Sequence, residues 1–288
     1  MSVPGDLSGH IALVTGASRG IGRAIARRLA AHGTAVVATA SARSLAGLEE
    51  TCELIRVKGG HAAFVEADLG DAAARADLVA RASAPFGPVD ILVNNAATIT
   101  AYAPPSKIDL SARHTLFEVN LQAPIDLIQQ ALPQMRAKGW GRILNITSEM
   151  ARQPPIPYVG PAKFIHALTL YGASKAALER YTRGLAAELH GTGIHANAVA
   201  PYRIAASESA AQVVGQALKS NPDWVEPVEM MAEAAFVLIA ASFNGLVVTS
   251  REVLQMSQQP LHALDGAHVI GDATTLYSPP TEPGMPRS

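Results

Sequence analysis

Apolar segments of strand length alternate with segments of helical periodicity along most of this 288-residue chain. The strand-like segments are almost continuously apolar, which is typical of parallel strands covered on both faces. They lie at residues 10–16, 34–40, 61–69, 89–97, 141–148 and 194–201. Because helical patterns separate them, we predict a single-domain α/β fold, a doubly wound parallel sheet with helices on both faces.

The composition favours a globular protein and excludes several classes. Hydrophobic residues make up 49% of the chain and charged residues 16%, so a large core can form. The formal net charge of -1 predicts no nucleic-acid surface and no polybasic membrane patch. There is no apolar run of the roughly 20 residues that a membrane span needs, no signal-peptide pattern, and no disulfide partner for Cys52. We expect a cytoplasmic protein without a membrane or nucleic-acid partner.

A glycine-rich loop follows the first predicted strand, in the sequence TGASRGIG from Thr15 to Gly22. Glycines permit a tight turn and a close approach of the backbone to a ligand. The helix that begins in this loop offers unpaired N–H groups and the positive end of its dipole. The loop therefore predicts a site for the phosphates of a nucleotide.

Tyr171 and Lys175 lie four residues apart in the sequence YGASK, and Ser148 ends the fifth predicted strand. Residues at this spacing share one face of a helix. A free tyrosine has a pKa of about 10, and a neighbouring ammonium group lowers it. We expect Tyr171 to transfer protons. The nine histidines show no metal-ligand spacing, and we predict no metal site.

These motifs together resemble the short-chain dehydrogenase/reductase family, and within it the 3-oxoacyl-carrier-protein reductases. The likeness covers about residues 8 to 205 in the family's order, and it implies a Rossmann fold. It is carried by TGASRGIG, Asp68-Leu69, NNAA (94–97), Asn120, Ser148, YGASK (171–175) and NAVAP (197–201).

The resemblance implies a catalytic set of four residues. Tyr171 would be the general acid/base, Ser148 would bind the substrate oxygen, and Lys175 would bind the nicotinamide ribose. Asn120 would hold a water that relays protons to Lys175. The implied cofactor contacts are Gly16, Ser18, Arg19, Gly20, Ile21, Gly22, Ser41, Arg43, Asp68, Leu69, Asn95, Ala96, Tyr171, Lys175, Pro201 and Ile204.

The end of the second predicted strand bears on the choice of nicotinamide cofactor. An acidic residue there would bind the adenosine ribose and repel a 2′-phosphate, but residues 39–43 read TASAR. Arg19, Ser41 and Arg43 could instead bind a phosphate. We therefore predict NADP rather than NAD.

The sequence also departs from the family pattern. Ser148 and Tyr171 are 23 positions apart, about twice the family's spacing, because a proline-rich segment intervenes. Tyr158 lies nearer the usual spacing, but Lys163 is off its helical face, so Tyr171 is the better candidate. Alanine or tyrosine stands where the family has glycine or threonine, at Ala97, Tyr202 and Ala206.

We predict an oxidoreductase that transfers a hydride between NADP(H) and a ketone or secondary alcohol, and that forms a homodimer or homotetramer. The catalytic domain would span 1–254, with a substrate loop at about 149–170, followed by an extension at 255–288 whose last residues are flexible. Apolar residues of the loop would shape the substrate pocket: Ile156, Tyr158, Val159, Phe164 and Ile165. Alternatives are a catalytically idle dinucleotide sensor or scaffold, an NAD-dependent alcohol dehydrogenase, and an epimerase or dehydratase.

Overall fold

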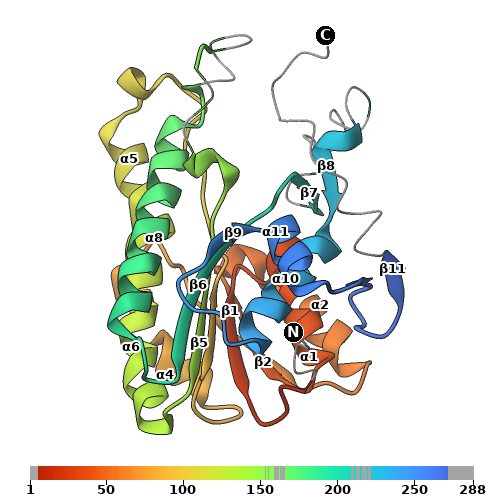
Figure 1. Ribbon diagram of the computed structural model, residues 1–288. Coiled ribbons are helices and arrows are strands. Elements are labelled where there is room, and N and C mark those ends of the chain that lie inside the picture. Colours follow the sequence, from red (N-terminus) through yellow and green to blue (C-terminus); the bar gives the residue numbers. More distant parts are fainter. Residues whose placement is uncertain are drawn as a thin grey trace.

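Seven parallel strands form the central sheet of the computed structural model (Figure 1). The model describes residues 6–152, 154, 156–158, 162, 166–208, 211, 215, 219 and 222–271. In spatial order the strands are β3 (Ala62–Glu66), β2 (Ala35–Ala40), β1 (Ile11–Thr15), β4 (Ile91–Asn94), β5 (Gly141–Ile146), β6 (Ile194–Ala200) and β9 (Val247–Thr249). All the pairings between neighbours are parallel, which confirms the predicted doubly wound sheet.

Helices cover both faces of the sheet (Figure 1). One face carries α1 (Gly20–Ala30), α2 (Leu45–Arg56), α10 (Val228–Ala240) and α11 (Ser250–Ser257). The other carries α3 (Ala72–Arg75), α4 (Leu78–Ser83), α5 (Leu110–Phe117), α6 (Ala123–Lys138) and α8 (Thr169–Glu188). Each face has its own buried apolar cluster, as expected for strands whose two sides are both apolar.

The strand order places a crevice at the carboxyl ends of β1 and β4. The chain winds outward from β1 in both directions, so β2 and β4 flank β1 and their following segments diverge. Ligands of doubly wound sheets bind in this crevice. Two short strands, β7 (Ile204–Ala206) and β8 (Val225–Pro227), pair with each other outside the main sheet.

Residues 110–138, between β4 and β5, form three helical elements rather than one continuous α-helix. The turn between α5 and α6 is a π-helix, η3 (Glu118–Gln122). Its physical cause is Pro124, at the start of α6. Proline has no N–H, so it cannot donate the α-helical hydrogen bond to the carbonyl of Asn120, four residues earlier. A π turn in the middle of a long helix is frequent at functional sites.

The predicted domain boundary at 254 falls inside α11. Thr249 and Glu252 form a reciprocal capping box that begins this helix, and it continues to Ser257. A hairpin of β10 (Leu261–His262) and β11 (Val269–Gly271) follows. Leu261 is buried in the apolar cluster of α10, so the extension up to residue 271 packs on the domain. The rest of the extension, residues 272–288, lies outside the described residues, and with it the end that was predicted to be flexible.

The remaining short elements are the 3₁₀ turns η1 (Ala42–Ser44), η2 (Pro105–Lys107), η4 (Glu149–Ala151) and η6 (Pro222–Trp224). Among the helices of the described part, none combines the length and the apolar character that crossing a bilayer would require.

Candidate active site

The glycine-rich loop joins β1 to α1 at the crevice, and its glycines are required by the local geometry. Gly16 and Gly20 have φ angles of 63° and 60°, which favour glycine. At Gly22 a Cβ atom would lie 2.4 Å from both the Asn95 Nδ2 and the Gly16 carbonyl oxygen. Only a glycine therefore fits where α1 passes the loop.

Thr15 and Asn95 hold this loop against the end of β4. The Thr15 hydroxyl accepts hydrogen bonds from the backbone N–H groups of Asn95 (2.9 Å) and Ala96 (3.0 Å). The Asn95 Nδ2 donates to the carbonyl oxygens of Thr15 (2.8 Å) and Gly16 (3.2 Å). The Asn95 side chain thus fixes the shape of the loop. The Thr15 hydroxyl also joins the loop to the end of β4, a role that the sequence did not predict.

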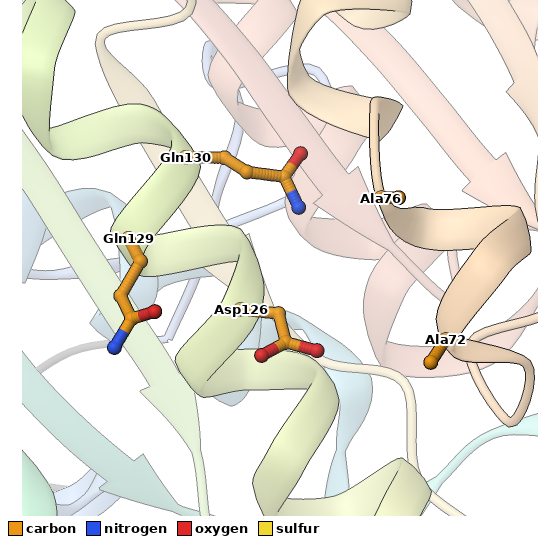
Figure 2. A pocket seen from close by; sticks show the side chains of 5 residues that line it. All are labelled: Ala72, Ala76, Asp126, Gln129 and Gln130. Carbon is orange, nitrogen blue, oxygen red and sulfur yellow. The ribbon is translucent and has the colours of Figure 1, made fainter.

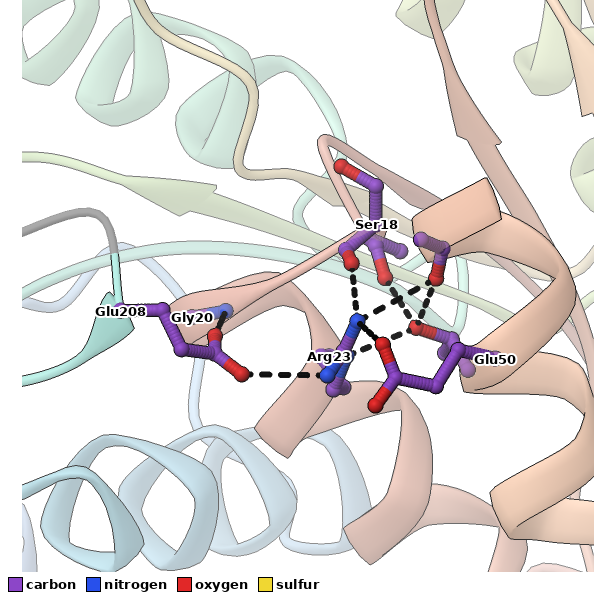
Figure 3. Close-up of polar contacts among 8 residues, drawn as sticks. Ser18, Gly20, Arg23, Glu50 and Glu208 are labelled. Atoms are coloured by element: carbon purple, nitrogen blue, oxygen red, sulfur yellow. Dashed lines mark hydrogen bonds and ion pairs between the residues drawn. The ribbon is translucent and has the colours of Figure 1, made fainter. Parts of the chain in front are cut away.

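A carboxylate lies at the N-terminus of α1 (Figure 3). The Gly20 N–H donates to Glu208 Oε2 at 2.5 Å, and Arg23 forms an ion pair with Glu208 Oε1 at 3.0 Å. No side chain of the loop caps this helix. The backbone of the loop therefore donates to an anionic oxygen, which is the kind of contact a phosphate needs, while phosphate binding itself stays a prediction.

The residues predicted to choose between NADP and NAD surround the end of β2. This strand ends at Ala40, and Ser41 follows half-buried. Arg43 and Arg19 are exposed. Next to them, Asp68 is exposed and its Oδ1 accepts from the Gly70 N–H at 2.9 Å, whereas Leu69 is buried. No acidic side chain lies on residues 39–43, so nothing there would repel a 2′-phosphate.

Ser148 and Tyr171 are brought together in spite of their distance in sequence. The Ser148 side chain hydrogen-bonds that of Tyr171, which lowers the pKa of the phenol, but burial outweighs it and the pKa is raised. The prediction that the neighbouring ammonium group lowers this pKa is therefore wrong for this structure. Tyr171 is held as a neutral phenol, a proton donor at neutral pH.

The close packing of η4 against the start of α8 explains how Ser148 reaches Tyr171. A Cβ on Gly172 would lie only 2.1 Å from the Met150 carbonyl oxygen, so the two backbones touch there. The proline-rich segment leaves and returns between these two points. Its Ile156 and Tyr158 are exposed, whereas Val159, Lys163, Phe164 and Ile165 lie outside the described residues.

Lys175 lies one turn further along α8, fully buried. Its Nζ donates to the Ile146 carbonyl at 2.8 Å and is 5.9 Å from the centroid of the Tyr171 ring. Burial lowers the pKa of Lys175 to about 8. The ammonium group therefore donates to the end of β5.

Asn120 ties the loop after β4 to α8. Its Oδ1 accepts from the Thr98 N–H at 2.8 Å, and its Nδ2 donates to the Thr98 carbonyl (3.0 Å) and the Ser174 hydroxyl (3.1 Å). The Ser174 hydroxyl in turn donates to the Tyr171 carbonyl at 2.7 Å. The Asn120 side chain is thus fully used within the protein, and a water held by this residue stays a prediction.

The segment Pro201–Ile204 leads from β6 to β7 and carries Tyr202 where the family has glycine. The Tyr202 N–H donates to the Ser250 hydroxyl at 3.1 Å, and its ring lies 4.7 Å from the Arg203 guanidinium carbon. Beneath it, buried Glu226 accepts from the Arg203 N–H (3.2 Å) and the Ser250 hydroxyl (2.9 Å). Glu226 thus fixes the backbone of the segment, and burial raises its pKa to about 7.

Glu226 should make the stability of the protein depend on pH between about 4.5 and 7. The Glu226 carboxyl has a pKa of about 7 in the folded state and near 4.5 in the unfolded state, so the folded state binds its proton more tightly. The contribution of this proton to the free energy of unfolding is fully present below pH 4.5 and is lost as the pH rises through about 7. Urea denaturation at pH 4.5 and pH 8 should show Glu226→Gln gaining roughly 3 kcal/mol relative to wild type at the higher pH. A difference that is the same at both pH values would contradict this.

Three further residues near the site were not found from the sequence. Tyr102, in the exposed loop after β4, lies close enough to Tyr171 to raise its pKa. Glu208 and Glu226 reach the site from segments far along the chain. A single glutamate in the sequence does not reveal its partner, and no pattern marked Tyr102.

A surface hollow of about 380 Å³ lies between α3 and α6, apart from these residues (Figure 2). It is lined by Ala72, Ala76, Asp126, Gln129 and Gln130. The Asp126 carboxylate accepts from the Arg75 Nε at 2.7 Å, and Gln130 bonds the Val79 N–H and the Arg75 carbonyl. Its polar side chains thus hold the helices together. The described residues also contain no group of three or more His, Cys, Asp or Glu placed to bind a metal ion.

Residues 10–216 of this chain match the model of a protein family described as short chain dehydrogenase. The short chain dehydrogenase penD of Penicillium thymicola is 38% identical over 188 residues, which cover 64% of this chain and 64% of that protein. The chain therefore spans less than two thirds of the length of this relative.

Two solved structures share the fold. A 3-oxoacyl (acyl-carrier-protein) reductase from Agrobacterium tumefaciens with NADP bound is 30% identical with a TM-score of 0.72, covering 85% of this chain and 93% of that one. A short chain dehydrogenase from Burkholderia cenocepacia in complex with NADP is 33% identical with a TM-score of 0.71, covering 84% and 96%.

The doubly wound sheet and the anion-binding loop at its switch point define a nucleotide-binding α/β protein. Within that class, the chain belongs to the short-chain dehydrogenase family, as its motifs predicted. The resemblance to 3-oxoacyl-carrier-protein reductases is also supported by one of the two structures.

Proposed function

We propose that the protein is an NADP-dependent oxidoreductase that acts on a ketone or secondary alcohol, with Tyr171 as its general acid/base. The observation that carries this is the contact of Ser148 with Tyr171 at the carboxyl end of β5, beside buried Lys175. A proton donor, a hydroxyl to bind the substrate oxygen and a buried cation converge there. The family of the chain and the NADP in two related structures support the same reaction class.

The residues present fit a dinucleotide. The loop from Thr15 to Gly22 leaves no room for a Cβ at Gly22, and its Gly20 N–H already binds an anionic oxygen. We assign the diphosphate to this loop and the adenosine to Asp68 and Leu69. The nicotinamide end would lie between Lys175 and the segment Pro201–Ile204. When bound, the nicotinamide supplies or accepts the hydride.

Tyr171 would donate its phenolic proton to the carbonyl oxygen of the substrate, or take the proton of an alcohol in reverse. Ser148 would donate a hydrogen bond to the same oxygen. A phenol is protonated at neutral pH even at its ordinary pKa of about 10, and burial raises the pKa of Tyr171 further. A water held by Asn120 would pass a proton from the solvent to Lys175, and Lys175 would return it to Tyr171.

The surroundings of Tyr171 favour an apolar substrate. Large apolar side chains are exposed on the two segments that flank it, which is a common feature of ligand sites. Ile99 and Tyr102 lie after β4, and Met150, Ile156 and Tyr158 lie after β5. We infer a ketone or alcohol with an aliphatic or aromatic body and one oxygen directed at Ser148.

Ser41→Asp should shift the preference from NADPH toward NADH. The new carboxylate would lie at the end of β2, where it repels a 2′-phosphate and can bind a ribose hydroxyl. The ratio of kcat/KM for NADPH to that for NADH should fall at least about tenfold, equivalent to ~1.4 kcal/mol. Arg43→Ala should lower the ratio in the same direction by a smaller amount. An unchanged ratio in both variants would contradict the NADP assignment.

The proposed function is tested by following the absorbance of reduced nicotinamide. Wild type is mixed with NADPH or NADH and a panel of aliphatic, aromatic and acyl-thioester ketones, and with the oxidised cofactors and the matching alcohols. Consumption of NADPH with at least one ketone is expected. Tight binding of NADPH without turnover on any substrate would instead support the idle sensor.

A further inference from the structure

Glu208 is the residue that occupies the anion site of the glycine-rich loop. It lies two residues beyond β7, and its carboxylate bonds the Gly20 N–H at 2.5 Å and Arg23 at 3.0 Å (Figure 3). These groups belong to the first turn of α1, whose helix dipole favours an anion at this end. The interaction joins residues 188 positions apart, so it is not a local feature of the loop.

The fold does not depend on this contact. Arg23 also donates to the Ser18 carbonyl (2.5 Å) and the Thr51 hydroxyl (3.0 Å), and it pairs with Glu50 at 2.7 Å. Without Glu208, Arg23 would lose the partner of its Nη1 but keep these bonds through its Nε and Nη2. The Glu208 side chain is 56% exposed, against 12% for that of Arg23, so solvent screens the carboxylate and weakens the pair. The carboxylate can leave the site at small cost.

A diphosphate and a carboxylate cannot both occupy the N-terminus of α1. Each needs the same backbone donor, and like charges held at contact distance repel. This step rests on the proposed function, which places the cofactor diphosphate on the loop from Thr15 to Gly22. On that placement, Glu208 must move before the cofactor binds.

We propose that Glu208 is a built-in competitor of the cofactor diphosphate and sets the affinity of the enzyme for NADP(H). In the free enzyme the carboxylate fills the diphosphate position, and only the fraction of molecules with Glu208 released accepts cofactor. The apparent dissociation constant is the intrinsic one divided by that fraction. Because Glu208 follows β7, cofactor binding also frees this end of the Pro201–Ala206 segment from α1.

Glu208→Gln tests this, with Glu50→Gln as a matched control. Both carboxylates pair with Arg23 and are similarly exposed, 56% and 59%, but only Glu208 bonds the Gly20 N–H. By fluorescence titration, Glu208→Gln should bind NADPH about fivefold more tightly than wild type, and Glu208→Ala at least as tightly. Glu50→Gln should remain within about twofold. Weaker or unchanged binding by Glu208→Gln, or equal tightening by Glu50→Gln, would overturn the proposal.

Two further titrations separate this inference from the proposed function. Adenosine 2′-monophosphate reports only the adenosine end, and its affinity should be the same in wild type and Glu208→Gln; an equal gain would mean a general charge effect and would overturn the proposal. Gly22→Ala, with its fold checked by circular dichroism, should lose NADPH. If it does so while Glu208→Gln matches wild type, the placement of the cofactor stands and the competitor role of Glu208 fails. If Gly22→Ala still binds NADPH normally, the placement itself fails.

Discussion

Tyr171→Phe is expected to lower kcat for ketone reduction by about 10³-fold, with the dissociation constant of NADPH changed less than about threefold. The substitution removes only the phenolic oxygen, which is hydrogen-bonded to Ser148 and is the proposed proton source. The ring remains in its half-buried place on α8, so the helix and Lys175 keep their positions. Stopped-flow absorbance of reduced nicotinamide at saturating substrate measures the change.

Tyr102→Phe is the matched control for this experiment. It deletes the same atom from a second tyrosine near the site, but Tyr102 is 70% exposed and the proposed mechanism gives it no proton to transfer. Its kcat should fall less than about tenfold. If Tyr171→Phe keeps more than a tenth of the activity, or if Tyr102→Phe is equally impaired, another group must supply the proton.

Glu233→Gln should lower the free energy of unfolding by about 3 kcal/mol. Glu233 and Arg28 form an ion pair of 2.6 Å with side chains only 1% and 2% exposed, where α10 crosses α1. His262 of the terminal hairpin joins them, 3.2 Å from Glu233. Removing one charge leaves the Arg28 guanidinium buried without its counter-charge. Urea denaturation followed by circular dichroism measures the loss.

The exposed pair Arg136–Glu188 provides the comparison. Its side chains are 54% and 60% exposed, so Glu188→Gln should change the free energy of unfolding by less than about 1 kcal/mol. Similar effects for the two variants would mean that burial does not determine the strength of the Arg28–Glu233 pair. A loss in Glu233→Gln with a changed denaturant slope would indicate that the hairpin separates before the domain unfolds.

The main sheet was predictable because six of its strands are continuous apolar runs, and their order follows from short right-handed crossovers. The strand β9 was missed because it has only three residues, Val247–Thr249, too few for a periodic signal. The break in the helix at 118–122 was missed for a different reason. Pro124 is compatible with a helix start as well as with an interior π turn, and the sequence alone does not separate these.

The candidate site shows the same limit at the level of side chains. Motif spacing identified Ser148, Tyr171 and Lys175, and the structure brings the first two into contact. Motif spacing did not show whether the pKa of Tyr171 is raised or lowered. That direction depends on the burial of the ring, which arises only on folding. The contact of Glu208 with Gly20 depends likewise on how β7 returns to α1.

The touching backbones at Met150 and Gly172 have a consequence for how this enzyme can change. They anchor both ends of the proline-rich segment, so its length does not enter the geometry of Ser148 and Tyr171. Loop closure entropy grows only with the logarithm of length, about 0.6 kcal/mol per doubling. Evolution or protein engineering can therefore replace this segment and alter the substrate, while the relative positions of Ser148 and Tyr171 stay the same.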